Sequence, residues 1–329
     1  MPDRLLAGIL VVPFALGLGS TATADTGEVA FHLRDPEIVE SSGLVAQDGL
    51  VLTTNDSGDT GRVFAVDPAT GDTVGVTHWS EHPVDTEALA PGGPGHVWVG
   101  DIGDNGADRD SISVARVPVG RGERTVHVAS YALAYPDGPH NAETLLADPR
   151  DGRLYVATKG VFGGRLYAAP RHLSASGTNR LAPVGDVLAI ATDGAFLPGG
   201  HAMVLRDYDQ AVVYSFPDLE RLATFVLPRQ EQGEGLAVVS ADELLVSSEG
   251  EDSAVLRVRL PRAVRAALAP RPPVPPVTEP ALPHPHTYSR AGRELPEATT
   301  TDRAAWPWFL TGWVVVGGLV LLLRSMRRR

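Results

Sequence analysis

Five copies of one sequence unit fill the middle of this chain, and this repetition limits the folds that it can adopt. Each copy begins with an acidic or serine-containing turn that is followed by small and apolar residues. The turns centre on five residues, here called the anchors, which are 45, 56, 50 and 41 residues apart. The anchors are Ser42, Glu87, Glu143, Asp193 and Glu234. Such spacing is the length of one four-stranded propeller blade.

Two further segments follow each anchor in the same order. The first is a nearly continuous apolar run, such as HVWVGDIG from position 96, which is typical of a strand covered on both faces. The second stops at a proline, as in GRLYAAP from position 164, because proline cannot donate to a strand ladder. Four units then have a fourth strand, including the stretches 125–135 and 180–190. The fifth unit has none, because the chain becomes proline-rich after 261.

The strand expected at 28–35 belongs to no unit, and we expect it to complete the fifth blade. The sequence therefore predicts an all-β, five-bladed β-propeller that is closed by its N-terminal strand. In a blade, the innermost strand begins on the face where the second strand ends. The anchors should therefore meet the residues that end the second strands, around the central channel. These residues are Asp56, Asp101, Lys159, Asp207 and Glu249.

Carboxylates crowded around one end of a channel indicate a site for a hard divalent cation. Ca²⁺ is the expected ion, because it accepts six to eight oxygen ligands in irregular geometry. The predicted metal ligands are Glu87, Asp101, Asp104 and Glu143. Alternatively, such acids accept backbone N–H bonds and tie neighbouring blades together. For Asp56, Asp59 and Asp108, which lie in glycine-containing turns, an Asx turn is the preferred interpretation.

A second candidate site lies in the stretch AYPDGPHNAE at 134–143. An imidazole beside a carboxylate can act as a general base, which makes His140 and Glu143 the candidate catalytic residues. Cationic side chains can hold an anionic oxygen of a ligand, and carboxylates nearby can complete its contacts. The predicted ligand contacts are Lys159, Arg206, Asp207 and Asp137. In the alternative interpretation, His140 caps a loop and Lys159 neutralises the ring of acids.

The two ends of the chain carry targeting signals. Residues 1–24 have the apolar run and small-residue cleavage site of a signal peptide. Residues 304–323 form an uncharged stretch long enough to span a bilayer, and the arginine-rich tail at 324–329 indicates a cytoplasmic C-terminus. The proline-dense linker at 263–303 should hold the propeller domain, 25–262, away from the membrane. These features predict a single-pass, type I cell-surface protein with the propeller outside.

The composition excludes several classes of partner and chemistry. The chain has no cysteine, so it forms neither disulfides nor thiolate metal sites. Its net charge of −12 argues against nucleic acid as a partner and suits a cation or a small molecule. The sequence contains no G-x-S-x-G elbow, P-loop or H-E-x-x-H motif.

Several motifs of the repeats resemble those of exported bacterial β-propeller proteins: ESSGL at 40, NDSGD at 55, GDIGDN at 100, YPDGPHNAE at 135 and TKG at 158. More distantly, the arrangement is similar to five-bladed calcium-dependent nucleotidases and to phytase-related, esterase-like and lactonase propellers. This resemblance implies a cation in the channel and attack by water on a phosphoester or lactone. In the nearer group the second anchor reads D-W-E-D, whereas this chain has Asp85-Thr86-Glu87-Ala88, so the role of the last acid does not carry over.

Three hypotheses on function follow. The first is a membrane-anchored, extracellular propeller that binds a small ligand or a divalent cation at its acidic axial face. The second is a calcium-dependent hydrolase of phosphoesters or lactones. The third is a purely structural surface protein, which would bind no ligand.

Overall fold

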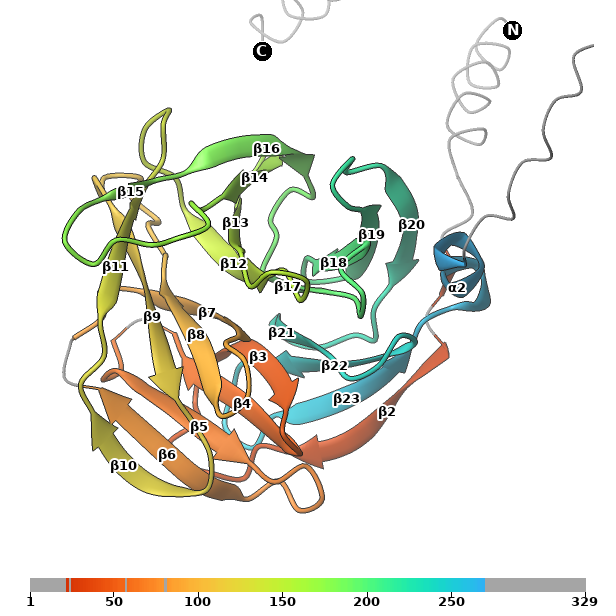
Figure 1. Ribbon diagram of the computed structural model, residues 1–329. Coiled ribbons are helices and arrows are strands. Elements are labelled where there is room, and N and C mark those ends of the chain that lie inside the picture. The colour runs from red at the N-terminus through yellow and green to blue at the C-terminus, as the bar shows by residue number, and fades with distance from the viewer. Residues whose placement is uncertain (1–21, 24, 57, 80–81, 270–329) are drawn as a thin grey trace, which may run out of the picture. The chain divides into compact units, whose positions relative to one another are not determined.

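The computed structural model describes residues 22–23, 25–56, 58–79 and 82–269, which form five sheets arranged around a central axis (Figure 1). The predicted five-bladed propeller is thereby confirmed. Most of the predicted signal peptide and linker, the predicted membrane span and the basic tail lie outside the described residues. Among the residues that are described, no helix has the length and hydrophobicity needed to cross a membrane.

The innermost strand of each blade carries its anchor at the first or second position. These strands contact one another in chain order, and the last returns to the first, so that together they enclose the axis. In four of them the pairing register shifts at the anchor, which marks a β-bulge that re-aims the side chain. The inner strands are β3 (Ser41–Gln47), β7 (Thr86–Pro91), β12 (Ala142–Ala147), β17 (Asp193–Phe196) and β21 (Gly233–Val238).

The second and third strands of each blade follow as antiparallel neighbours, as the apolar runs and proline stops predict. The second strands are β4 (Leu50–Asn55), β8 (His96–Asp101), β13 (Leu154–Thr158), β18 (Ala202–Arg206) and β22 (Glu243–Ser248). The third strands are β5 (Arg62–Val66), β9 (Ile112–Pro118), β14 (Gly164–Ala168), β19 (Gln210–Ser215) and β23 (Ala254–Arg259).

The hydrophobic core is divided into five clusters, one between each pair of neighbouring blades. Each blade gives alternate side chains to its two neighbours. In β12, for example, Leu145 packs toward the second blade and Leu146 toward the fourth. Both faces of every blade are therefore buried, which explains why these strands are continuous apolar runs rather than alternating ones.

Two outer segments differ from the prediction. The stretch 125–135, expected to be one strand, is divided between two blades. In it, β10 (Gly122–Val126) pairs in parallel with β6 of the first blade, and only β11 (Ser130–Ala134) completes the second blade. The stretch 180–190 is divided in the same way: β15 (Asn179–Arg180) joins β11, and β16 (Ala182–Val187) completes the third blade. The short added strands cover edges that would otherwise leave backbone groups unpaired.

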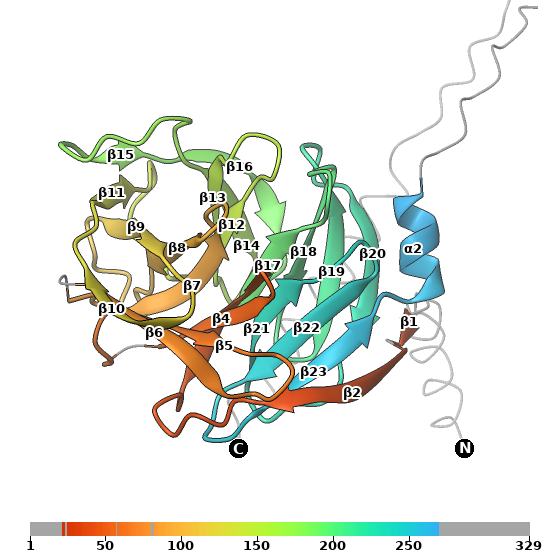
Figure 2. The same cartoon turned by 60° about the horizontal axis from the view of Figure 1, so that its bottom comes forward.

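The remaining outer strands close the ring. The outer strands of the first and fourth blades are β6 (Thr73–Trp79) and β20 (Arg221–Val226). The fifth blade is completed by β2 (Asp25–His32), which pairs antiparallel with β23 and so confirms closure by the N-terminal strand (Figure 2). Just before it, β1 (Ala22–Thr23), which lies within the predicted signal peptide, pairs in parallel with β20. The N-terminal segment thus repeats the pattern of β10 and β11: it contacts the preceding blade before it completes its own.

The helix α2 (Arg262–Leu268) follows β23, where the sequence predicts the start of an extended linker at 263. It is held to the propeller by Val264, which is buried in the cluster between the fourth and fifth blades. All strands of the five sheets come from residues 22–259. Residues 22–269 therefore contain all the strands, core clusters and closing pairs that the structure describes, and they belong to one compact unit of the chain.

Candidate functional site

The anchors gather at one end of the channel, as predicted. Glu87, Glu143 and Glu234 are buried there, with exposed fractions of only 4–5%. The hydroxyl of Ser42 donates to the carbonyl oxygen of Glu87 at 2.6 Å and so ties the first blade to the second. We call this end of the channel the acidic end.

Three carboxylates of the acidic end form a compact group. Asp56 follows β4, Asp85 directly precedes β7, and Glu87 is the second anchor. Each offers a carboxylate oxygen, and these oxygens lie within 4.8 Å of one another. Another oxygen of the group, Oδ1 of Asp85, is buried without a hydrogen-bond partner. Several carboxylate oxygens gathered this closely are the kind of ligand set that a hard cation prefers.

The motif GDIGDN at 100–105 covers the end of β8 and the loop after it, and its second glycine, Gly103, allows this group to form. A Cβ atom on Gly103 would lie 2.2 Å from Oδ2 of Asp85 and 2.9 Å from Cγ of Glu87. Both distances are far shorter than van der Waals contact, so only glycine permits the loop to pass so close to the two acids. The backbone N–H of Gly103 also donates to the carbonyl oxygen of Asp85.

Glu143 and Lys159 form the neighbouring part of the acidic end. Nζ of Lys159 lies 2.5 Å from Oε1 of Glu143 and donates to the hydroxyl of Tyr208 at 2.9 Å. The other carboxylate oxygen of Glu143, Oε2, is buried and has no hydrogen-bond partner. One lysine therefore satisfies half of this carboxylate and leaves its second oxygen available to a ligand.

Burial and mutual repulsion keep protons on these acids. Burial, and next the charge of Glu143, raises the pKa of Glu87 to about 10 and that of Glu234 to about 8. Burial raises the pKa of Glu143 itself to about 7, against the opposing effect of Lys159. Burial, together with neighbouring acids, raises the pKa of Asp85 to about 6. A cation bound here would displace the proton that Glu87 otherwise retains at neutral pH.

The predicted metal ligands Asp101 and Asp104 do not join this group. Oδ1 of Asp101 accepts from the backbone N–H of Asp85 at 2.9 Å and forms an ion pair with Arg109 at 3.0 Å. The two oxygens of Asp104 accept the backbone N–H groups of Asp108 and Arg109 at 3.0 Å each. Both carboxylates hold the loop after β8, so the predicted set of four ligands is not formed.

The predicted catalytic residues His140 and Glu143 are drawn to different partners. Nε2 of His140 lies 3.2 Å from Oδ1 of Asp137 and 3.2 Å from the hydroxyl of Tyr167. Tyr167 also donates to Oδ2 of Asp137 at 2.8 Å. Burial, and next its bond to Asp137, raises the pKa of Tyr167 to about 12. His140 is thus oriented by Asp137, while Glu143 faces Lys159 in the channel.

Two of the predicted ligand contacts, Arg206 and Asp207, hydrogen-bond to the backbone of the propeller instead. Arg206 is fully buried, and its guanidinium donates to backbone carbonyls of the fourth and fifth blades, including that of Gly235 at 3.0 Å. This burial does not fit the predicted contact of Arg206 with an anionic ligand. Asp207 caps a turn, because its Oδ1 accepts the backbone N–H groups of Asp209 and Gln210 at 2.9 and 2.8 Å.

The metal ligands predicted from the sequence do not include Asp56 and Asp85. Asp56 was interpreted as a turn former, although its position 14 residues after an anchor already marks it as the end of a second strand. Asp85 precedes the anchor Glu87 by two residues in the same turn. That shared position was the available signal. Asp59, which was interpreted in the same way as Asp56, does form a local network and accepts from Asn55 and Arg62 at 2.8 Å each.

Comparisons with known proteins leave the family open. No known family pattern and no curated protein matches the sequence. Among solved structures, the chain is similar to a luciferin-regenerating enzyme with 12% identity and a TM-score of 0.43, over 71% of this chain and 95% of the other. It is also similar to a gluconolactonase from Xanthomonas campestris, with 13% identity and a TM-score of 0.43, over 74% of this chain and 98% of the other. A chain of a nidogen–laminin complex is similar with 16% identity and a TM-score of 0.41, over 64% of this chain and 73% of the other. The fold assignment rests on the strand pairing described above and not on these similarities.

Proposed function

We propose that the acidic end of the channel binds a divalent cation, with Ca²⁺ as the preferred ion, and that the bound ion completes a binding site for a small ligand. The observation that carries this proposal is the group of Asp56, Asp85 and Glu87, whose carboxylate oxygens converge within 4.8 Å. Buried oxygens without donors on Asp85 and Glu143 extend the same set.

The donor set favours Ca²⁺ over other metals. All the candidate ligands are carboxylates, which suit hard cations, whereas zinc and copper sites usually include histidine or cysteine. The ligands come from separate elements of the first three blades, and Ca²⁺ tolerates the irregular geometry that results, whereas Mg²⁺ demands a near-ideal octahedron. Lys159 does not replace the cation, because its Nζ is engaged by Glu143 and Tyr208.

Calcium titration of residues 22–269 is expected to show one saturable site with weaker binding of Mg²⁺. At 100 times its dissociation constant, an ion that binds only the folded protein adds about 2.7 kcal/mol of stability. Glu87→Gln removes one ligand charge and should weaken binding about tenfold or more. Isothermal calorimetry and thermal unfolding measure both effects.

The matched control for this titration is Asp110→Asn, which removes an exposed acid from the loop after β8 and should leave calcium binding unchanged. Equal affinity in the Glu87→Gln variant, or no calcium response in the original protein, would contradict the proposed site.

The pairing of His140 with Asp137 supports hydrolysis as a second function, because an oriented imidazole can activate water. The Ca²⁺-loaded protein distinguishes the two functions when phosphoesters and lactones are added. Turnover that needs Ca²⁺ and is lost in His140→Gln would support the hydrolase. Saturable binding without turnover would support the binding module.

The stability of the Ca²⁺-free protein should fall as the pH rises from about 5 to about 10. Folding raises the pKa values of Glu143, Glu234 and Glu87 from 4.5 to about 7, 8 and 10. Their contribution is therefore complete below the unfolded pKa and is lost as the pH passes through the folded values. Urea unfolding at three pH values measures this slope. Both Ca²⁺ and Glu87→Gln should flatten it, and a stability that rose over the interval would contradict the assignment.

A further inference from the structure

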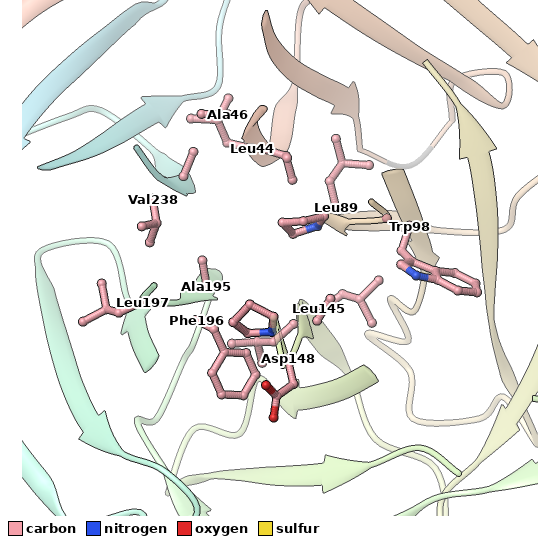
Figure 3. A pocket seen from close by; sticks show the side chains of 18 of the residues that line it. Leu44, Ala46, Leu89, Trp98, Leu145, Asp148, Ala195, Phe196, Leu197 and Val238 are labelled. Carbon is pink, nitrogen blue, oxygen red and sulfur yellow. The ribbon is translucent and has the colours of Figure 1, made fainter. Parts of the chain in front are cut away.

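The channel has a second end with the opposite chemistry. Toward the C-terminal ends of the inner strands it widens into a cavity of about 450 Å³. All five inner strands contribute to the wall, and Figure 3 shows their side chains around an open centre. The larger apolar side chains of the wall are Leu44, Leu89, Trp98, Leu145, Phe196 and Val238. We call this end of the channel the apolar end.

The side chains of the wall of the apolar end are mostly apolar. Its one acidic side chain, Asp148, is almost fully buried and accepts from Nε and Nη2 of Arg150 at 2.9 and 2.6 Å. The other lining residues, all of them described, are apolar, glycine or proline. A ligand that enters this cavity would therefore gain mainly from the burial of apolar surface.

Asp193 connects three blades next to the apolar end of the channel. It is fully buried, and its Oδ2 accepts the backbone N–H groups of Leu44 at 3.2 Å and Leu236 at 2.7 Å. Its side chain thus connects the fourth blade to the first and fifth at the level where the apolar wall begins. The wall of the apolar end contains none of Asp56, Asp85 and Glu87, so the two ends have separate sets of side chains.

We propose that the apolar end binds the aliphatic chain of an amphiphilic small molecule, whose polar end stays in solvent. The volume lies within the range of small-molecule pockets, roughly 300–1,000 Å³. The inner-strand hairpins at this end carry charged residues at their tips, namely the exposed Asp48 and the ion pairs of Asp151 with Arg171 and of Asp242 with Arg265. A flat protein surface would meet this charged rim before it touched the apolar wall, whereas a thin aliphatic chain passes inside it.

Trp98 provides a test, because it is one of the lining residues, at the outer side of the wall with its indole directed away from the centre (Figure 3). ω-Bromoundecanol, used below its solubility limit, should quench the tryptophan fluorescence of residues 22–269, since bromine quenches on contact. We expect saturable, one-to-one quenching that disappears in Trp98→Phe and persists in Trp79→Phe, a buried tryptophan of the outer strand β6. Unbrominated undecanol should compete. Quenching that does not saturate, or that survives in Trp98→Phe, would overturn the proposal.

Filling the cavity gives a second readout. Ala195→Phe places a ring in the channel from β17 and should weaken binding about tenfold or more, because the ring occupies the space of the chain. Ala46→Phe does the same from β3 if the first variant fails to fold. Val184→Phe on the exposed outer strand β16 is the control and should bind normally. Normal binding in both filling variants would refute the site.

The test also separates other occupants and the proposed cation site. Concentration-dependent dimerisation that Ala195→Phe abolishes, without any quenching by bromoundecanol, would identify a second copy of the chain as the occupant and overturn the proposal. Glu87→Gln should leave the quenching unchanged. Failure of the cation site and failure of the apolar site are therefore distinguishable.

Discussion

Replacing Asp193 by alanine is expected to lower the free energy of unfolding by about 3–5 kcal/mol, because three buried backbone donors lose their acceptor. These donors are the N–H groups of Leu44, Leu236 and Gly194, at 3.2, 2.7 and 2.7 Å from the carboxylate oxygens. They belong to three different blades, and no water reaches the fully buried side chain to replace the lost oxygens.

Urea unfolding of residues 22–269 measures this loss. Asp207→Ala is the matched control, because Asp207 caps a half-exposed turn in the same blade and also accepts two backbone N–H groups. Its loss should cost only about 1 kcal/mol, since water can solvate the freed donors. If the two variants unfold at the same denaturant concentration, Asp193 does not join the blades as described.

Arg206→Ala is expected to lower the free energy of unfolding by a similar amount, about 3–5 kcal/mol. This is the usual cost of removing one partner from a buried network of charged groups. The guanidinium donates to the carbonyl oxygens of Asp207, Gly235 and Ser247 at 3.0, 3.0 and 3.3 Å. Removing it would leave carbonyls of two blades unsatisfied. It would also take away a positive charge that opposes the rise in the pKa of Glu234 caused by burial. Arg180→Ala, an exposed arginine at the rim of the second blade, is the control and should be nearly neutral.

A double-mutant cycle with Gly233 isolates the contact that makes room for this side chain. A Cβ atom on Gly233 would lie 2.0 Å from Nη2 of Arg206, so Gly233→Ala should be strongly destabilising by itself. In the Arg206→Ala background the same change should cost much less, because the clash is gone. Additive costs in the cycle would show that the two positions are not in contact.

The propeller could be predicted because each blade repeats a local pattern that decides its own strands. The anchors, the apolar second strands and the proline stops lie at regular distances, and a blade buried on both faces needs the same residue types each time. The stretch 125–135 was predicted wrongly for a related reason. Its residues suit a strand throughout. Its first part nevertheless belongs to β10, which pairs with the free edge of β6 in the first blade, and only β11 pairs within the second blade.

The location of the candidate site could be predicted from the sequence, but the residues that form it could not. The positions of the anchors relative to the second-strand ends place the acids at one end of the channel. They do not decide which acid is free: Arg109 engages Asp101, and backbone N–H groups engage Asp104, whereas Asp85 keeps a buried oxygen without a donor. Such competition depends on loop paths through space, for which the spacing along the chain has no signal.

The sequence by itself determined the number of blades, the closure by the strand near 28–35 and the gathering of the anchors at one pole, because periodic burial and strand direction follow from local residue order. Only the tertiary structure decided that Asp56 and Asp85 complete the acidic group, that Arg206 and Asp193 connect blades, and that the other pole is an apolar cavity. The reason is that each of these features is made by side chains from several blades, and their distances exist only once the ring has closed.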